Sequence, residues 1–361
     1  MGIDEDPFRS LLCAIGNWYN SSGQTERDFP LSKESNTSDP LWRQAELFIN
    51  DWYVFLSLHQ IRLLQLCPIL GFMAVSLVIP VLLAKILTRP QMCQETRYLL
   101  LANVLLSDLL FLTMYTLCTC VNAAGVLMSE WACATMLFLL GALYSSGILS
   151  TKAIVLDTSL AVLAPLRYFA LWPVSRTKKV ILGIWAVSVI FPAGSAGVFV
   201  WYHTTWPCSL QLCSAPLLLV LTVSLSAPLQ MSLLLAVTIV LLILLLVFSG
   251  YVILYWRTRT VGIQRGSRSS RARGTFLMHY FHLLLSFCPL LVLAIELLLY
   301  CHQGVQDLRA NLWVSLVLCN LLLVLPKALA PYLYGFRYRE LRSVLLSFYG
   351  LKRPSAVTPM I

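Results

Sequence analysis

The sequence predicts an all-α membrane protein, a seven-transmembrane helix bundle with a short cytoplasmic amphipathic helix. Three observations lead to this prediction: seven long apolar stretches, basic residues confined to alternate loops, and few charges overall. Hydrophobic residues make up 58% of the chain and charged residues 12%, whereas about 25% of residues are charged in a typical soluble domain. A soluble core of this length does not need so apolar a composition.

Each apolar stretch is long enough to cross a bilayer, which takes about 20 apolar residues in a helix. The stretches are residues 63–87, 98–121, 134–158, 179–201, 229–255, 275–300 and 311–334. They divide the chain into an N-terminal tail (1–62), a transmembrane bundle (63–334) and a C-terminal segment (335–361). Residues 335–348 place apolar and basic side chains on opposite sides of a helix. This pattern is typical of a helix that lies along the membrane and contacts its lipids.

The basic residues indicate which ends of the spans face the cytoplasm. Of the 26 Lys and Arg residues, 18 lie in alternate connections or after the last span, and short cytoplasmic loops retain positive charge. This distribution predicts an extracellular N-terminus, a cytoplasmic C-terminal segment and a multi-pass protein of the plasma membrane. Two glycosylation sequons, at Asn20 and Asn36, lie in the tail predicted to be extracellular.

The same residues argue against several classes of function. The net charge of +10 does not indicate nucleic-acid binding, because the basic residues lie beside apolar spans and form no known nucleic-acid module. The spans show no paired inverted repeats of the kind that transporters carry. The spans also contain no group of residues that could act as a catalytic nucleophile with its general base. His279 and His282 alone are too few ligands to bind a metal ion. We therefore expect no enzyme, no catalytic residue, no cofactor and no metal site.

Three cysteines outside the apolar spans indicate an extracellular disulfide. Cys133 stands at the outer end of the third span, and Cys208 and Cys213 lie in the following extracellular loop. An oxidising exterior allows Cys133 to pair with either, and sequence does not decide between them. We favour Cys208, because Cys213 is nearer to the next apolar run.

Several spans also carry polar, aromatic or proline residues in a set order. In the second span, Asp108 ends the run Tyr98-Leu-Leu-Leu-Ala-Asn-Val-Leu-Leu-Ser-Asp108. Cys133 and Asp157 mark the two ends of the third span, and Trp185, Pro289 and Pro331-Tyr-Leu-Tyr334 follow in later spans. From about residue 70 to 345 this ordered set resembles the class A (rhodopsin-like) G-protein-coupled receptors, including orphan members. The resemblance implies a receptor that transmits an extracellular ligand signal to a heterotrimeric G protein.

The end of the third span departs from that family. Where most members carry Asp-Arg-Tyr, this chain reads Asp157-Thr158-Ser159, followed by Pro165 in the next loop. The resemblance places these residues against the G protein, and the arginine that would enter it is absent. We therefore predict weak or atypical coupling. Asp157 has lost its usual neighbour, which makes Arg167 a candidate partner.

The seventh span departs from the family as well. Lys327 lies four residues before Pro331 in an otherwise apolar helix, and an ionisable side chain at membrane depth usually pairs inside the bundle. In the family, the aspartate at the position of Asp108 binds sodium with help from polar groups on other helices. The matching positions here offer no side-chain oxygen: Ile79, Gly147 and Ala330. We predict that the Lys327 ammonium replaces sodium on Asp108; the alternative is that Lys327 reaches the lipid headgroups.

The resemblance also implies an activation switch and a ligand cavity. The switch residues would be Phe287 and Pro289 in the sixth span, with Pro331 and Tyr334 in the seventh. In the cavity, Glu296 is the candidate ligand contact. No aspartate occurs in the outer part of the third span, which argues against a biogenic amine and leaves the ligand unknown.

Two alternative functions stay open on the sequence. The spacing Arg271-Ala272, Thr275 and His279 resembles odorant receptors, which suggests a chemosensory-type receptor. A non-signalling seven-helix scaffold would explain the missing arginine together with the replacement of the seventh helix's usual asparagine by Ala330.

Overall fold

The computed structural model describes most of the helix bundle. The described residues are 58–124, 126, 128–163, 168, 173–203, 209, 210, 213, scattered positions between 238 and 274, 277–292, 295 and 305–351. Among them, five helices are long and apolar enough to span a membrane, and a shorter apolar helix covers Leu277–Val292. The predicted fifth span, 229–255, lies mostly outside the described residues.

The first span consists of two consecutive helices, and a short helix connects it to the second span. Helices α3 (Leu58–Ser76) and α4 (Val78–Thr88) meet at Leu77 and together make the first span. Helix α5 (Pro90–Cys93) begins with a proline, which suits a first helical turn because that turn needs no N–H donor. It leads into α6 (Thr96–Ala123), the second span.

The remaining long helices are α7 (Glu130–Leu163), α9 (Val174–His203) and α13 (Val305–Arg337). Each extends beyond its predicted apolar window; α7, for example, exceeds the window 134–158 by four residues at one end and five at the other. The windows mark only the hydrocarbon-crossing part, because a helix continues to satisfy its own backbone groups in the polar headgroup layer.

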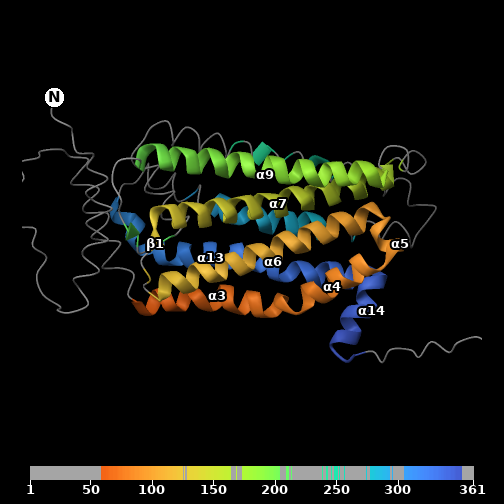
Figure 1. The fold of residues 1–361 in the computed structure, drawn as a ribbon, viewed down its shortest axis with the longest axis horizontal. Helices are drawn as coiled ribbons and strands as arrows, with labels where there is room; N and C mark the ends of the chain where they lie inside the picture. Colours follow the sequence, from red (N-terminus) through yellow and green to blue (C-terminus); the bar gives the residue numbers. More distant parts are fainter. Residues whose placement is uncertain are drawn as a thin grey trace, which may run out of the picture.

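The helices run roughly side by side along one axis (Figure 1). Helix α6 packs against α3, α7, α9 and α13, and its fully buried side chains form much of the core: Leu100, Leu101, Leu105 and Leu112. Leu63, Leu66 and Leu70 of α3 and Leu182 of α9 are exposed. In a membrane-spanning bundle such residues face lipid.

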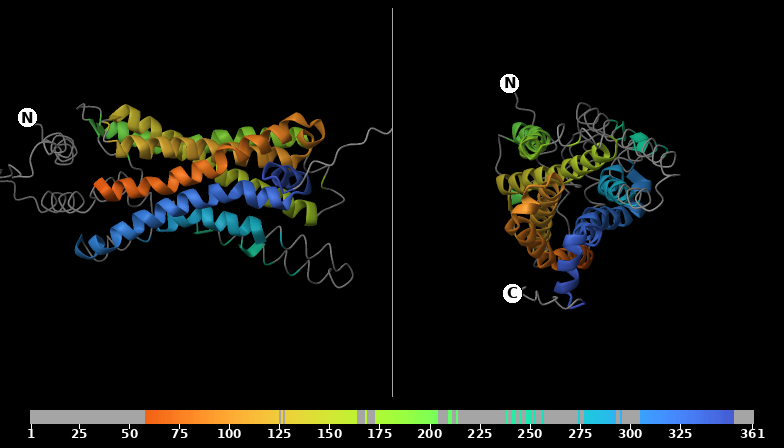
Figure 2. Two further views of the ribbon diagram at one scale, coloured as in Figure 1. Left: turned by 90° about the horizontal axis from the view of Figure 1, so that it is seen from below. Right: turned by 90° about the vertical axis from the view of Figure 1, so that its right-hand side faces the viewer.

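The two ends of the bundle differ. At one end, β1 (Met128–Ser129) pairs antiparallel with β2 (Ser209–Leu210). At the other end lie α5 and α14 (Arg339–Phe348), and α14 turns away from the axis of α13 (Figures 1 and 2). Leu341 and Leu345 of α14 are buried while Arg339 and Arg342 are exposed, so α14 is amphipathic.

Candidate functional site

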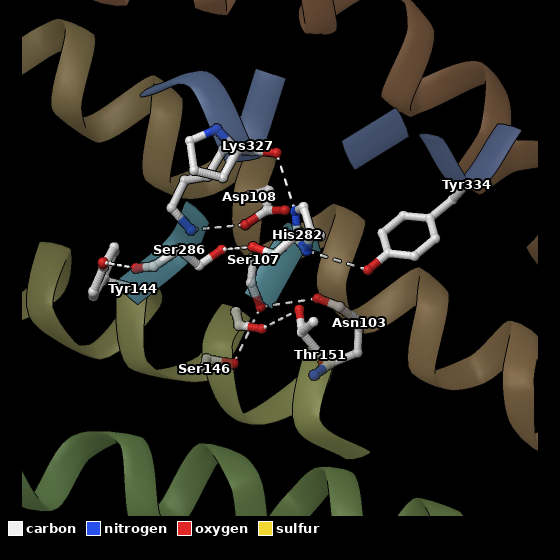
Figure 3. A network of polar contacts seen from close by, with 12 residues as sticks. Asn103, Ser107, Asp108, Tyr144, Ser146, Thr151, His282, Ser286, Lys327 and Tyr334 are labelled. Atoms are coloured by element: carbon white, nitrogen blue, oxygen red, sulfur yellow. Dashed lines mark hydrogen bonds and ion pairs between the residues drawn. The ribbon is translucent and has the colours of Figure 1, made fainter. Parts of the chain in front are cut away.

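A buried ion pair joins α13 to α6 in the middle of the bundle. The Nζ atom of Lys327 lies 2.8 Å from Oδ1 of Asp108 and donates a hydrogen bond to it. Both residues are at least 95% buried, and the two side chains point toward each other between their helices (Figure 3). The Lys327 ammonium is therefore inside the bundle and does not reach the lipid headgroups.

Aromatic rings complete the surroundings of the ammonium. Nζ of Lys327 lies 4.6 Å from the centre of the Phe111 ring and 5.2 Å from that of Tyr144. The negative faces of such rings attract a cation. Among the described residues, the second carboxylate oxygen of Asp108, Oδ2, has no hydrogen-bond partner. The Lys327 ammonium thus has a carboxylate and two aromatic rings around it, whereas only one oxygen of the Asp108 carboxylate has a partner.

A glycine gives the ion pair its space. A Cβ atom at Gly147 of α7 would lie 3.1 Å from Oδ1 of Asp108 and 3.2 Å from Nζ of Lys327. Ile79 and Ala330 are fully buried and supply no side-chain oxygen. The three positions that resemblance assigns to a sodium site therefore leave room for an ammonium and offer no side-chain oxygen to a metal ion.

A polar network beside the pair fastens α6 to α7 and α9. The Asn103 amide donates to the Ser150 hydroxyl at 2.6 Å and accepts from the Trp185 indole at 3.0 Å. One turn along α6, the Ser107 hydroxyl donates to the Asn103 carbonyl and lies 3.1 Å from the Ser146 hydroxyl (Figure 3). These buried bonds hold the helix that carries Asp108.

The predicted switch residue Tyr334 contacts two histidines of the sixth helix. Nε2 of His282 lies 3.1 Å from the Pro326 carbonyl, and Nδ1 lies 3.4 Å from the Tyr334 hydroxyl. A carbonyl only accepts, so Nε2 of His282 donates and Nδ1 accepts from Tyr334. His279 packs against the same tyrosine ring, and its ring nitrogens have no hydrogen-bond partner among the described residues. Tyr334 is thus linked to the carbonyl of the residue before Lys327.

The other predicted switch residues lie in the sixth and seventh helices. Phe287 is buried and packs with Ile148 of α7 and Leu283. Pro289, two residues further, is buried, and its carbonyl accepts a weak hydrogen bond from Cys319. Pro331 is a buried residue within α13.

At the end of α7, Asp157 is bound by a tyrosine. The Tyr168 hydroxyl donates to Oδ1 of Asp157 at 2.7 Å. Burial, together with this hydrogen bond to a carboxylate, raises the pKa of Tyr168, so the phenol stays protonated. The hydroxyls of Thr158 and Ser159 donate to carbonyls of their own helix, those of Ile154 and Val155. The residues that replace Arg-Tyr therefore bond within α7.

At the opposite end, Cys133 forms its disulfide with Cys213. The preference for Cys208 is therefore wrong. The backbone of Cys213 is held by Asn122 of α6, whose amide donates to the Cys213 carbonyl at 2.8 Å and accepts from the Cys213 N–H at 3.0 Å. Cys208 lies outside the described residues. These bonds fasten Cys213 to α6, and its nearness to an apolar run does not prevent the pairing.

Two comparisons decide the family. The family model of the 7 transmembrane receptor (rhodopsin family) matches residues 79–341. A human protein described as probable G-protein coupled receptor 148 is 30% identical over 284 residues, which are 77% of this chain and 80% of that protein. The chain belongs to the rhodopsin family of seven-transmembrane receptors. It is a multi-pass membrane receptor with a seven-helix bundle, and its family is not a class of enzymes. Membership implies coupling to a G protein and an extracellular ligand.

Several predicted site residues of this rhodopsin-family receptor lie outside the described residues. They are Pro165, Arg167, Glu296 and the sequon residues Asn20 and Asn36. Their predicted roles stay predictions.

Sequence reasoning about this rhodopsin-family receptor missed Lys152 of α7. Its Nζ atom lies 5.1 Å from the centre of the Phe287 ring, within the helix that spans Trp131–Ala161. A signal was present. In the second, third, sixth and seventh apolar windows, Lys152 and Lys327 are the only Lys or Arg residues.

Proposed function

We propose that this receptor transmits an extracellular signal to a heterotrimeric G protein through an atypical coupling surface, with Lys327 as a built-in replacement for the sodium ion. The observation that carries the proposal is the Lys327–Asp108 ion pair, at 2.8 Å and at least 95% buried. A built-in cation cannot diffuse away, so the link between α6 and α13 would not depend on external sodium.

The orientation in this proposal is that of an extracellular N-terminus in the plasma membrane, with α5 and α14 in the cytoplasm. It is supported by the basic residues of alternate connections and by the position of α5 and α14 at the end opposite the Cys133–Cys213 disulfide. Amphipathic α14 would contact anionic lipids through Arg339 and Arg342. Loss of a glycosidase-sensitive gel shift in Asn20→Gln/Asn36→Gln tests the location of the tail.

The coupling surface proposed for the G protein comprises Asp157, Thr158, Ser159 and Pro165. The short side chains at 158 and 159 bond to their own helix and present no cation. The Tyr168 hydroxyl donates a hydrogen bond to Asp157, whose usual neighbour in other members is an arginine. Coupling would then depend on contacts from the basic loops.

Ligand-independent recruitment of each G-protein class tests this function, in cells where glycosylated surface receptor has been verified. The wild type and Thr158→Arg are compared, with Thr158→Gln as a control of similar length and no charge. We expect measurable recruitment by the wild type. Activity in Thr158→Arg alone would show that only the coupling residue is lost. Silence of all three at matched surface levels would contradict basal coupling and favour the non-signalling scaffold.

A further inference from the structure

Lys152 lies within the membrane-spanning part of α7. The apolar window 134–158 ends six residues after Lys152, which corresponds to about 9 Å of helix. A hydrocarbon core is about 30 Å thick, so the backbone of this lysine lies inside the core. The side chain is partly exposed.

The Lys152 ammonium points further into the membrane, not out of it. Nζ lies over the ring of Phe287, and Phe287 packs with Ile148, one turn before Lys152 in α7. Side chains in a helix lean toward its N-terminus, which carries Nζ away from the nearer end of the span at Ala161. Lys152 therefore does not reach the closer headgroup layer.

No carboxylate among the described residues forms an ion pair with Lys152; the buried ion pair there joins Lys327 to Asp108. The chain contains no Asp or Glu between Asp157 and Glu296, so the fourth and fifth spans and most of the sixth cannot supply one. Asp108 is bound to Lys327 and Asp157 to Tyr168. Neither of these two carboxylates forms an ion pair with Lys152.

A charge at membrane depth is costly without a counter-ion, and the surroundings of Lys152 are apolar. Leu156, one turn along α7, is 49% exposed, and Leu284 and Leu291 of the sixth helix pack partly buried against Phe287. An anion that enters here must therefore carry its own apolar part.

We propose that Lys152 and Phe287 form a binding site for the anionic head group of a single-chain amphiphile, a carboxylate or a phosphate. Its hydrocarbon chain would lie along the apolar faces of α7 and the Leu277–Val292 helix. The head group would contact the ammonium beside the ring of the predicted switch residue Phe287, so occupancy would bear on the position of that ring. Binding itself requires no G protein and does not depend on the coupling mechanism.

The test measures the thermal unfolding midpoint of full-length receptor purified in a neutral detergent. Oleate, oleoyl lysophosphatidate and oleyl alcohol are titrated separately, and the two acids distinguish a fatty carboxylate from a lipid phosphate. For at least one acid we expect a saturable rise in the wild type and in Lys152→Arg. Lys152→Gln should require at least about tenfold more of that acid, as expected for the loss of one charge-assisted contact. Oleyl alcohol should not distinguish the variants.

Lys178→Gln is the matched control, because Lys178 is an exposed lysine on α9 and its replacement removes the same charge elsewhere. Equal responses of Lys152→Gln and the wild type to both acids would overturn the proposal, as would a chloride titration that reproduces the rise. If Lys152→Gln does not purify as a single species, a photoreactive oleate is cross-linked to the wild type. Labelled peptides from α7 or residues 277–292 support the site, and labelling only elsewhere overturns it.

Discussion

Two lysines lie at membrane depth in this receptor, and they are neutralised differently. Lys327 contacts a carboxylate at 2.8 Å and two aromatic rings. Lys152 contacts one aromatic ring, and the structure shows no carboxylate with it among the described residues. The first arrangement satisfies a charge within the protein, whereas the second leaves a charge available to a ligand. A buried cation can thus be a structural element or a binding group, depending on its counter-ion.

The largest effect should come from breaking the Lys327 pair. Lys327→Leu leaves the carboxylate of Asp108 buried without a cation, which costs about 3–5 kcal/mol of stability. We expect a lower thermal midpoint of the purified receptor and a strong loss of surface protein. Lys152→Leu is the matched control, because it also replaces a lysine within a span by leucine. The amount of this variant at the cell surface should equal that of the wild type. Normal folding of Lys327→Leu would remove the distinction between the two lysines.

A smaller effect should come from crowding the same pair. A methyl group at Gly147 would press on both charged atoms, and overpacking of this kind costs roughly 1–3 kcal/mol. Gly183→Ala on α9 is the control, because a Cβ atom at Gly183 has no neighbour within 4 Å. We expect Gly147→Ala to unfold at a lower temperature than Gly183→Ala. Equal midpoints would show that the pair has room to move.

The smallest stability change should follow removal of the unpaired cation. Lys152→Met loses a cation–π contact worth roughly 0.5–2 kcal/mol and also removes a charge that has no counter-ion among the described residues. We expect a midpoint equal to or above that of the wild type in the absence of added amphiphile. A fall as large as that of Lys327→Leu would reveal a protein partner for Lys152.

Much of this architecture could be predicted from the sequence, because long apolar windows and scarce charges leave few arrangements in a bilayer. Lys327 and Asp108 stand out as ionisable residues inside apolar spans, and their partnership is one of few that avoid an unpaired charge. The structure also shows the amphipathic α14 that residues 335–348 indicate.

The contacts that sequence reasoning missed depend on tertiary structure. The backbone of Cys213 is bonded to the amide of Asn122, which is 91 residues away in the chain. Nothing in the sequence indicated that the Tyr168 hydroxyl would donate to Asp157; the predicted partner Arg167 lies outside the described residues. The direction of Lys152 depends on how α7 packs against Phe287. Composition and spacing carry no information on such side-chain orientations.

The most direct test of the Lys327–Asp108 link is a double-mutant cycle on the thermal and chemical stability of the purified receptor. Its four members are the wild type, Lys327→Leu, Asp108→Leu and the double variant. Because the double variant leaves no buried charge unpaired, we expect it to be more stable than either single variant, with a coupling energy of at least about 2 kcal/mol. A double variant that loses the sum of the two single losses would show that the two charges do not stabilise each other.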